Sequence, residues 1–131
     1  MIDHLSTYAS DYIASRDFYI AAFRPLAYPM LFEEVTSWDA DWPTRRMCAF
    51  GPEGKPVFWV IETRDAASPR HTAFVAPNRA AVAAFHQAGL TAGGQDNGAP
   101  GLRPIYHEHY FGAFLLDPDG NNVEAVCHAP E

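Results

Sequence analysis

The sequence is poor in cysteine and in basic residues. Its two cysteines, Cys48 and Cys127, are too few and too far apart for a disulfide framework or a paired-cysteine zinc site, and we expect both to be buried strand thiols. Nine Lys and Arg residues stand against 16 Asp and Glu, which gives a net charge of −7, and no basic run is present. These features argue against binding to nucleic acid or to an anionic membrane.

Long apolar segments are also missing. No uninterrupted apolar run reaches about 18 residues, so a transmembrane helix is not expected. The first residues, MIDHLSTYASD, lack a basic segment followed by an apolar one, so we expect no signal peptide and a cytoplasmic location. The chain does have 131 residues, 48% of them hydrophobic, which suffices for the core of a single domain.

What the sequence does contain is a near-repeat, in which His4 and His71 occupy the same place 67 positions apart. At that shift three apolar positions of the first copy also meet apolar positions of the second: Ala14 with Ala81, Phe18 with Phe85 and Ala21 with Ala88. At a shift of 66, the turn sequence GPEG at 51–54 meets DPDG at 117–120. Two copies of a small unit, each opening with a strand histidine, can bring those histidines to one shared centre.

Each copy predicts the order β-α-β-β-β. In the first copy we expect a helix over 12–23 and strands over 2–8, 31–35, 46–50 and 57–61. In the second we expect a helix over 79–88 and strands over 71–76, 105–107, 110–116 and 122–128. The glycine- and proline-rich stretch 93–104 is expected to be a loop over a site. The expected organisation is one domain, 1–131, made of modules 1–64 and 69–128, whose two sheets enclose a cavity.

The doubled order, the two strand-opening histidines and the closing run YFGAFLLDPDGNNVEAVCH at 110–128 resemble the vicinal oxygen chelate superfamily. That superfamily includes glyoxalase I, extradiol ring-cleaving dioxygenases, fosfomycin-resistance enzymes and bleomycin-binding proteins. The resemblance covers essentially the whole chain. It implies an α+β fold in which two tandem modules form an open mixed sheet around a cavity. It also implies a divalent metal chelated by neighbouring substrate oxygens, although some members bind no metal.

The positions that match the superfamily's metal ligands are His4, His71 and Glu124. Two imidazoles and one carboxylate, with positions left open for substrate, suit iron, manganese, zinc or nickel. Strand alternation adds a condition that can be checked. If Glu124 faces the cavity, Ala125 and Cys127 must face the helices.

The fourth ligand of a glyoxalase-I-like site has no obvious counterpart. When the two turns are aligned, Glu124 meets Phe58, and Glu62 is the nearest carboxylate, about 13 Å further along an extended strand. The pattern therefore resembles the three-ligand site of the dioxygenases and fosfomycin enzymes. Phe114 stands where the dioxygenase signature has a tyrosine, which argues against standard ring cleavage, since a phenyl ring has no hydroxyl. His107 remains a candidate catalytic acid or base.

The other histidines have weaker claims. We expect His86 to be solvated on a helix, and His128 to make structural or partner contacts. Arg45, Arg46 and Arg103 could meet an anionic substrate. Three functions stay open: a metal-dependent lyase, isomerase or dioxygenase acting on a small oxygen-chelating substrate, a metal-free drug-sequestering protein of the bleomycin-resistance kind, and a structural dimer without chemistry. Because one β-α-β-β-β sheet cannot close a cavity, and related small proteins dimerise, we expect a homodimer with the site at or near its interface.

Overall fold

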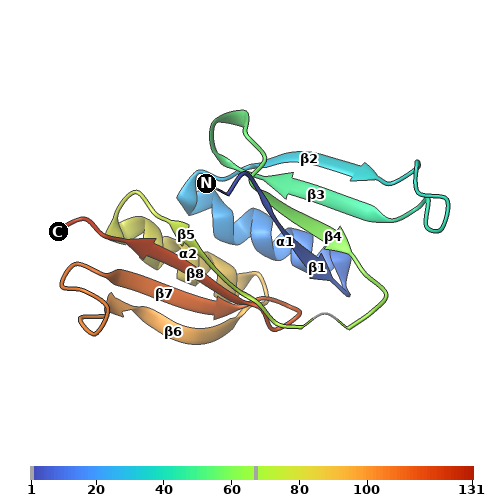
Figure 1. The fold of residues 1–131 in the computed structure, drawn as a ribbon. Coiled ribbons are helices and arrows are strands. Elements are labelled where there is room, and N and C mark those ends of the chain that lie inside the picture. The colour runs from blue at the N-terminus through green and yellow to red at the C-terminus, as the bar shows by residue number, and fades with distance from the viewer. Residues whose placement is uncertain (1, 67) are drawn as a thin grey trace.

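The chain forms two four-stranded sheets and two long helices in a computed structural model, which describes residues 2–66 and 68–131 (Figure 1). The first module contains β1 (Leu5–Ala9), α1 (Tyr12–Phe23), the short 3-10 turns η1 (Arg24–Leu26) and η2 (Pro52–Gly54), β2 (Met30–Val35), β3 (Arg46–Phe50) and β4 (Phe58–Glu62). The second contains β5 (His71–Val75), α2 (Arg79–Thr91), β6 (Gln95–Leu102), β7 (Phe111–Leu116) and β8 (Asn122–Cys127).

The two sheets have the same topology. Their strand orders are β1-β4-β3-β2 and β5-β8-β7-β6, and in each the opening strand runs parallel to the closing strand while the other pairs are antiparallel. This confirms the predicted α+β fold with tandem βαβββ modules and a mixed pattern of pairing. The sheets remain separate rather than joined into one closed barrel.

One segment was assigned wrongly from the sequence. The stretch predicted as a loop over 93–104 contains β6, and the strand expected over 105–107 is a turn. The glycines and prolines of this stretch are typical of a loop, but they belong to an edge strand. Strand β6 pairs irregularly with β7, with register shifts around Gly98 and Gly101. An edge strand tolerates proline, and bulges tolerate glycine.

Both helices begin as the sequence predicts. The Asp11 carboxylate accepts a hydrogen bond from the Ala14 amide at 3.1 Å, and the Asn78 side chain accepts one from the Ala81 amide at 2.8 Å. However, α2 continues through Gly89 to Thr91, although Gly89 was expected to end it. A side chain at Gly89 would come within 2.2 Å of the Leu115 side chain, so glycine there permits close packing of α2 on β7. No described helix has the length and apolarity needed to span a membrane.

The two modules share one hydrophobic core. Phe74 of β5 packs against Phe23 of α1 and Phe58 of β4, with ring centroids 4.6 Å and 5.1 Å apart. Helices α1 and α2 also pack against each other (Figure 1). The helix-facing positions of β8 include Ala125 and Cys127, both almost fully buried in this core, as alternation from Glu124 predicted.

Polar contacts fix the second hairpin against the start of α1. The Tyr19 hydroxyl donates to Asp117 Oδ2 at 2.6 Å in a fully buried contact. The Ser10 hydroxyl donates to Asp119 Oδ1 at 2.5 Å, and the Ser15 hydroxyl reaches the other oxygen at 3.3 Å. The Asp-Pro-Asp-Gly turn therefore joins the modules as well as reversing the chain.

Candidate functional site

The strongest polar pair in the second module is His71 with Glu124. His71 opens β5, Glu124 lies in the neighbouring strand β8, and His71 Nε2 lies 3.2 Å from Glu124 Oε2. Glu124 is 2% exposed, whereas nearly half of the His71 side chain is exposed. A buried carboxylate therefore faces an imidazole that solvent or a ligand can reach.

The tautomer of His71 is fixed by its other ring nitrogen. Nδ1 lies 3.1 Å from the Asn122 carbonyl oxygen, which can only accept, so Nδ1 carries the proton. In the neutral ring, the lone pair of Nε2 then faces the Glu124 carboxylate. An imidazole nitrogen with a free lone pair and a carboxylate oxygen at this distance are both donor atoms that divalent metals accept. The donor chemistry of the pair fits two ligands of a divalent metal.

Tyr110 supports the carboxylate from the opposite side. Its hydroxyl donates to Glu124 Oε1, which leaves Oε2 for His71. Desolvation, the hydrogen bond to Glu124 and the charge of that carboxylate together raise the pKa of Tyr110 well above its ordinary value. Tyr110 therefore stays a hydrogen-bond donor. The sequence suggested Tyr110 only as a residue that could line a substrate cavity; its bond to Glu124 was not predicted, because the dioxygenase pattern directed attention to position 114.

His107 and His128 form a second pair beside Tyr110. His107 Nε2 lies 2.6 Å from His128 Nδ1, and the rings stack with centroids 4.8 Å apart. Both rings also meet the Tyr110 ring edge-on. The His109 amide donates to His107 Nδ1 at 3.1 Å, so the proton of a neutral His107 lies on Nε2 and points to His128. Both nitrogens of His107 are therefore engaged, and the nitrogen left for a ligand is Nε2 of His128.

Phe114 lies across the sheet from Glu124 and packs on His71. It is the antiparallel partner of Glu124, and its ring stacks near that of His71 with centroids 6.3 Å apart. The Arg103 guanidinium lies 5.5 Å from the centre of the same ring. Phe114 thus forms an apolar wall for the His71–Glu124 pair, and the hydroxyl that it lacks is supplied by Tyr110.

His4 does not join this cluster. Its Nδ1 lies 2.7 Å from Asp3 Oδ1, and more than half of its side chain is exposed. Across residues 2–66 and 68–131, no three His, Cys, Asp or Glu side chains come together in a group that could hold a metal. The structure therefore brings together two of the three expected ligands, and leaves His4 exposed at the start of β1.

The alignment that paired Glu124 with Phe58 was wrong by one residue. In the parallel pairs, Ser6 lies beside Trp59, and its repeat equivalent Ala73 lies beside Glu124. Trp59 is therefore the counterpart of Glu124, since a slip of one residue exchanges the two faces of a strand. Phe58 instead points into the core. Neither residue is a metal ligand, so the conclusion that Glu124 has no carboxylate twin is unchanged.

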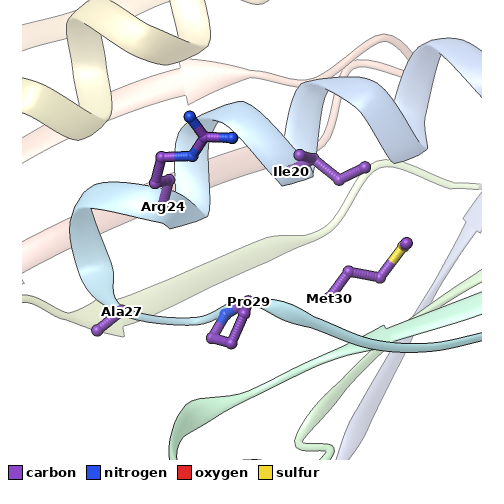
Figure 2. A pocket seen from close by; sticks show the side chains of 5 residues that line it. All are labelled: Ile20, Arg24, Ala27, Pro29 and Met30. Carbon is purple, nitrogen blue, oxygen red and sulfur yellow. The ribbon is translucent and has the colours of Figure 1, made fainter.

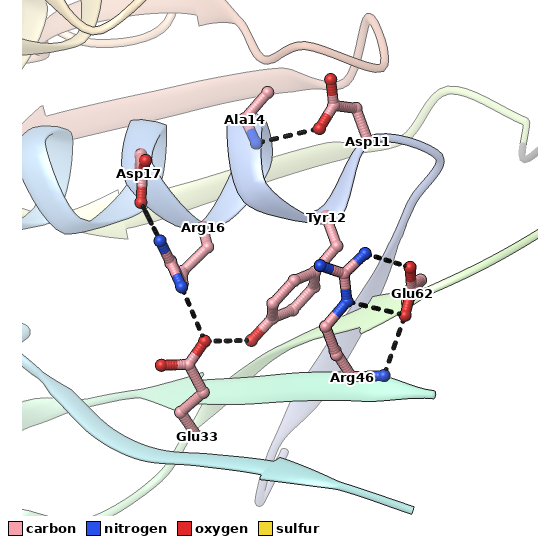
Figure 3. Close-up of polar contacts among 8 residues, drawn as sticks. All are labelled: Asp11, Tyr12, Ala14, Arg16, Asp17, Glu33, Arg46 and Glu62. Atoms are coloured by element: carbon pink, nitrogen blue, oxygen red, sulfur yellow. Dashed lines mark hydrogen bonds and ion pairs between the residues drawn. The ribbon is translucent and has the colours of Figure 1, made fainter. Parts of the chain in front are cut away.

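Glu62 is held by Arg46 and not by the candidate site, as Figure 3 shows. Its side chain lies on the same face of β4 as Phe58, the face that packs on the core. It accepts hydrogen bonds from the Arg46 amide at 2.9 Å and from the Arg46 guanidinium at 2.5 Å. The Arg46 guanidinium holds the pKa of the Glu62 carboxyl below its usual value. It also lies 5.0 Å from the centre of the Tyr12 ring. Glu62 is thus part of a structural ion pair on the helix side of the first sheet.

The expectation that His86 is solvated was also wrong. It is 8% exposed, and its Nε2 lies 2.9 Å from Asp96 Oδ1, so it ties α2 to β6.

Two surface hollows lie away from this cluster. One of about 230 Å³ is lined by side chains of α1, η1 and the start of β2, shown in Figure 2: Ile20, Arg24, Ala27, Pro29 and Met30. A second, of about 500 Å³, lies between α1 and α2. Neither is lined by a pair of groups suited to metal binding or proton transfer.

No protein-family model matches the sequence, and no curated protein matches it. Solved structures do match. A glyoxalase/bleomycin resistance protein from Albidiferax ferrireducens T118 superposes with a TM-score of 0.76 at 22% identity, over 96% of this chain and 97% of the other. A lactoylglutathione lyase from Agrobacterium tumefaciens gives 0.66 at 16% identity, over 97% and 92%.

A glyoxalase I mutant from Zea mays gives a TM-score of 0.68 at 20% identity; the match covers 95% of this chain and 46% of that longer one. These likenesses, with the doubled βαβββ topology, confirm at the level of the fold the resemblance that the sequence carries. The chain has the fold of the vicinal oxygen chelate superfamily.

Proposed function

We propose that the protein is a divalent-metal-dependent enzyme that acts on a small substrate with neighbouring oxygen atoms. The observation that carries this proposal is the His71–Glu124 pair, in which the imidazole Nε2 lies 3.2 Å from a buried carboxylate oxygen while Nδ1 is held by the Asn122 carbonyl. When bound, a divalent ion would supply Lewis acidity to substrate oxygens. The hydrogen bonds to these two residues also fit a metal site, because the Asn122 carbonyl orients His71 and the Tyr110 hydroxyl orients Glu124.

The third ligand in this proposal is His4 of a second copy of the chain. His4 is exposed. Within the described part of the chain its ring bonds only to the neighbouring Asp3, so it is free to reach a second molecule. Large apolar side chains of both modules are exposed and could be covered in a dimer, among them Phe32, Trp38, Val75 and Ile105. A homodimer would then contain two equivalent sites, each with ligands from both chains.

The acid–base group of the proposed enzyme is the His107–His128 pair. His128 presents Nε2 to the ligand, and His107 holds the other side of that ring at 2.6 Å. In this proposal His107, the catalytic candidate from the sequence, positions His128, and His128 contacts the substrate. Because His128 accepts from His107 at Nδ1, the proton of a neutral His128 lies on Nε2, so His128 would serve as the proton donor in lyase or isomerase chemistry.

Metal content tests the proposal. Purified protein is loaded with zinc, manganese, nickel or ferrous iron, desalted and analysed by elemental mass spectrometry. We expect bound metal in the wild type and its loss in His71→Ala and in Glu124→Gln, with circular dichroism unchanged. His86→Ala is the matched control, since that histidine pairs with Asp96 on the other side of the module. Wild-type protein without bound metal under every loading condition would refute the proposal.

A second function rests on the absence of a three-ligand group within one described chain. A metal-free protein that sequesters a small aromatic or cationic molecule would use the same face, with Tyr106, Tyr110 and Phe114 as stacking surfaces. Ligand affinity that is unchanged by a strong chelator would favour this function over the enzyme.

A further inference from the structure

Basic residues are scarce in this chain, yet five of its nine Lys and Arg residues fall between positions 45 and 70: Arg45, Arg46, Lys55, Arg64 and Arg70. Arg46 is neutralised by Glu62. The other three arginines of this group form no ion pair with a described carboxylate. Arg45 donates only Nε to the Glu62 carbonyl, at 2.7 Å, while Arg64 and Arg70 lie against the rings of Trp42 and Tyr8. In a protein of net charge −7, a local group of guanidinium side chains without carboxylate partners raises the positive potential at that part of the surface.

Two of these guanidinium groups converge on one hollow. A cavity of about 360 Å³ lies where the end of β1 meets the segment between the modules, and Arg45 and Arg70 both line it. Tyr8, Thr63 and Ser68 line the same cavity, and the Thr63 hydroxyl is engaged with the Asp65 backbone, donating to its carbonyl at 3.4 Å and accepting from its amide at 3.2 Å. Tyr8 and Ser68 thus supply the remaining hydroxyl donors. Its volume is within the usual range for a small-molecule site. Arginine forks and hydroxyls are the donors that recognise carboxylate and phosphate groups.

Asp65 also lines the cavity and must be counted against an anion. It supplies one negative charge against the two positive charges of Arg45 and Arg70, so the lining keeps a net positive charge. Tyr8 and Arg70 give the cavity one rigid side, since the guanidinium lies 5.9 Å from the centre of the Tyr8 ring. The backbone of Arg70 is fixed as well, because its amide donates to Asn121 Oδ1 at 2.9 Å.

We propose that this cavity binds an oxyanion, a phosphate or carboxylate group, through the guanidinium groups of Arg45 and Arg70 with the hydroxyls of Tyr8 and Ser68. Arg70 directly precedes His71 in the chain, but successive residues of an extended segment point to opposite faces, and neither His71 nor Glu124 lines this cavity. The cavity is therefore proposed as a site separate from the His71–Glu124 pair. The oxyanion site itself does not depend on a metal.

The test uses inorganic phosphate and acetate as probes, on full-length protein kept metal-free with a chelator and at constant ionic strength set by chloride. Isothermal titration and the shift in Tm measure binding. We expect saturable binding of at least one probe, and a weakening by at least about tenfold in Arg70→Gln and in Arg45→Gln, which corresponds to the loss of one charge-assisted contact. Binding of phosphate alone would identify a phosphoryl group as the recognised chemistry, and binding of acetate would identify a carboxylate.

Arg24→Gln is the control, because Arg24 is an exposed arginine that lines other hollows and is expected to leave probe binding unchanged. Arg70→Gln keeps the backbone contact of Arg70 with Asn121, so it tests the side chain without removing that anchor. No saturable binding of either probe, or wild-type affinity in the Arg45→Gln/Arg70→Gln double variant, would overturn the proposal. Since metal is absent throughout, such a failure would not bear on the metal-dependent function.

Discussion

His71 Nε2 lies 3.2 Å from Glu124 Oε2, and the two residues come from adjacent parallel strands rather than from one turn of chain. In the register of those strands, His71 lies beside Asn122 and Ala73 lies beside Glu124. His71 therefore reaches along the sheet, guided by the Asn122 carbonyl on one ring nitrogen and by the carboxylate on the other. The fold positions a histidine and a buried acid together without local sequence proximity.

The Tyr110 hydroxyl is expected to tune metal affinity through Glu124. Tyr110→Phe removes the donor to Oε1 and keeps the ring that packs on His107 and His128. Loss of an outer-layer hydrogen bond to a metal ligand commonly costs about tenfold or more in affinity. We expect a weaker Kd for zinc by that order, measured in a competition assay with a chromophoric chelator. Tyr106→Phe is the control, since its exposed hydroxyl bonds to neither ligand; an equal loss in both variants would contradict the assignment.

The Arg46–Glu62 ion pair should make stability depend on acid. Arg46 lowers the pKa of Glu62 in the folded state, so the pair stabilises the protein above the ordinary pKa of a glutamate and loses this effect as pH falls through the lowered value. Glu62→Gln should lower the free energy of unfolding at pH 7 by the modest amount expected of a solvent-screened pair, and the difference from wild type should shrink from about pH 5 downward. Urea unfolding at several pH values measures it, with the exposed Glu53→Gln as control. A pH-independent difference would refute the ion-pair account.

The buried Tyr19–Asp117 hydrogen bond should hold the modules together. Tyr19→Phe leaves Asp117 with its remaining donors, the amides of Asp119 and Asn121 and the Asn121 side chain, but removes the one from α1. Loss of a buried hydrogen bond to a charged acceptor typically costs about 1.5–3 kcal/mol. Chemical denaturation should show this loss. Tyr28→Phe, at a half-buried site, should change the free energy of unfolding by less; equal effects would mean that the bond to Asp117 is not what stabilises the junction.

Both thiols should be unreactive in the folded protein. Cys48 and Cys127 are at most 2% exposed, and burial raises the pKa of Cys48 to about 11. Because the thiolate is the reacting form, a thiol reagent at pH 8 should modify neither cysteine in native protein and both after unfolding in urea. Rapid labelling of either cysteine in native protein, followed by mass spectrometry, would contradict this packing.

The sequence predicted most of the fold because its local signals agree with the tertiary structure. The strand over 46–50 and the helix over 12–23 appear with the predicted bounds, since apolar periodicity, caps and turns all point the same way there. The strand β6 was missed because glycine and proline occupy an irregular edge strand. Trp59 was missed as the counterpart of Glu124 because the segment joining β3 to β4 is longer than the turn between β7 and β8, so alignment of the turns shifts the strand by one residue.

The contacts of the candidate site likewise include some that the sequence could predict and some that it could not. The approach of His71 to Glu124 could be expected because both residues lie at matching ends of the paired first and last strands of the second module. The contacts of Tyr110 and His128 could not, since they depend on how the turn at 103–110 folds back over the end of β8. No sequence pattern encodes that approach. His4 has the correct place in the repeat, yet the fold of one chain does not bring it to His71.

The most direct test of the central claim, that the metal site is completed by His4 of a second copy, is complementation between two inactive variants. His4→Ala and Glu124→Gln should each bind no metal as homodimers. After the two are unfolded together and refolded, each mixed dimer should contain one intact site, formed by His4 of the Glu124→Gln chain with His71 and Glu124 of the His4→Ala chain. Metal analysis of the isolated mixed dimer should therefore find about one ion per dimer. A mixed dimer that stays metal-free, while wild-type protein carried through the same refolding binds metal, would contradict the account.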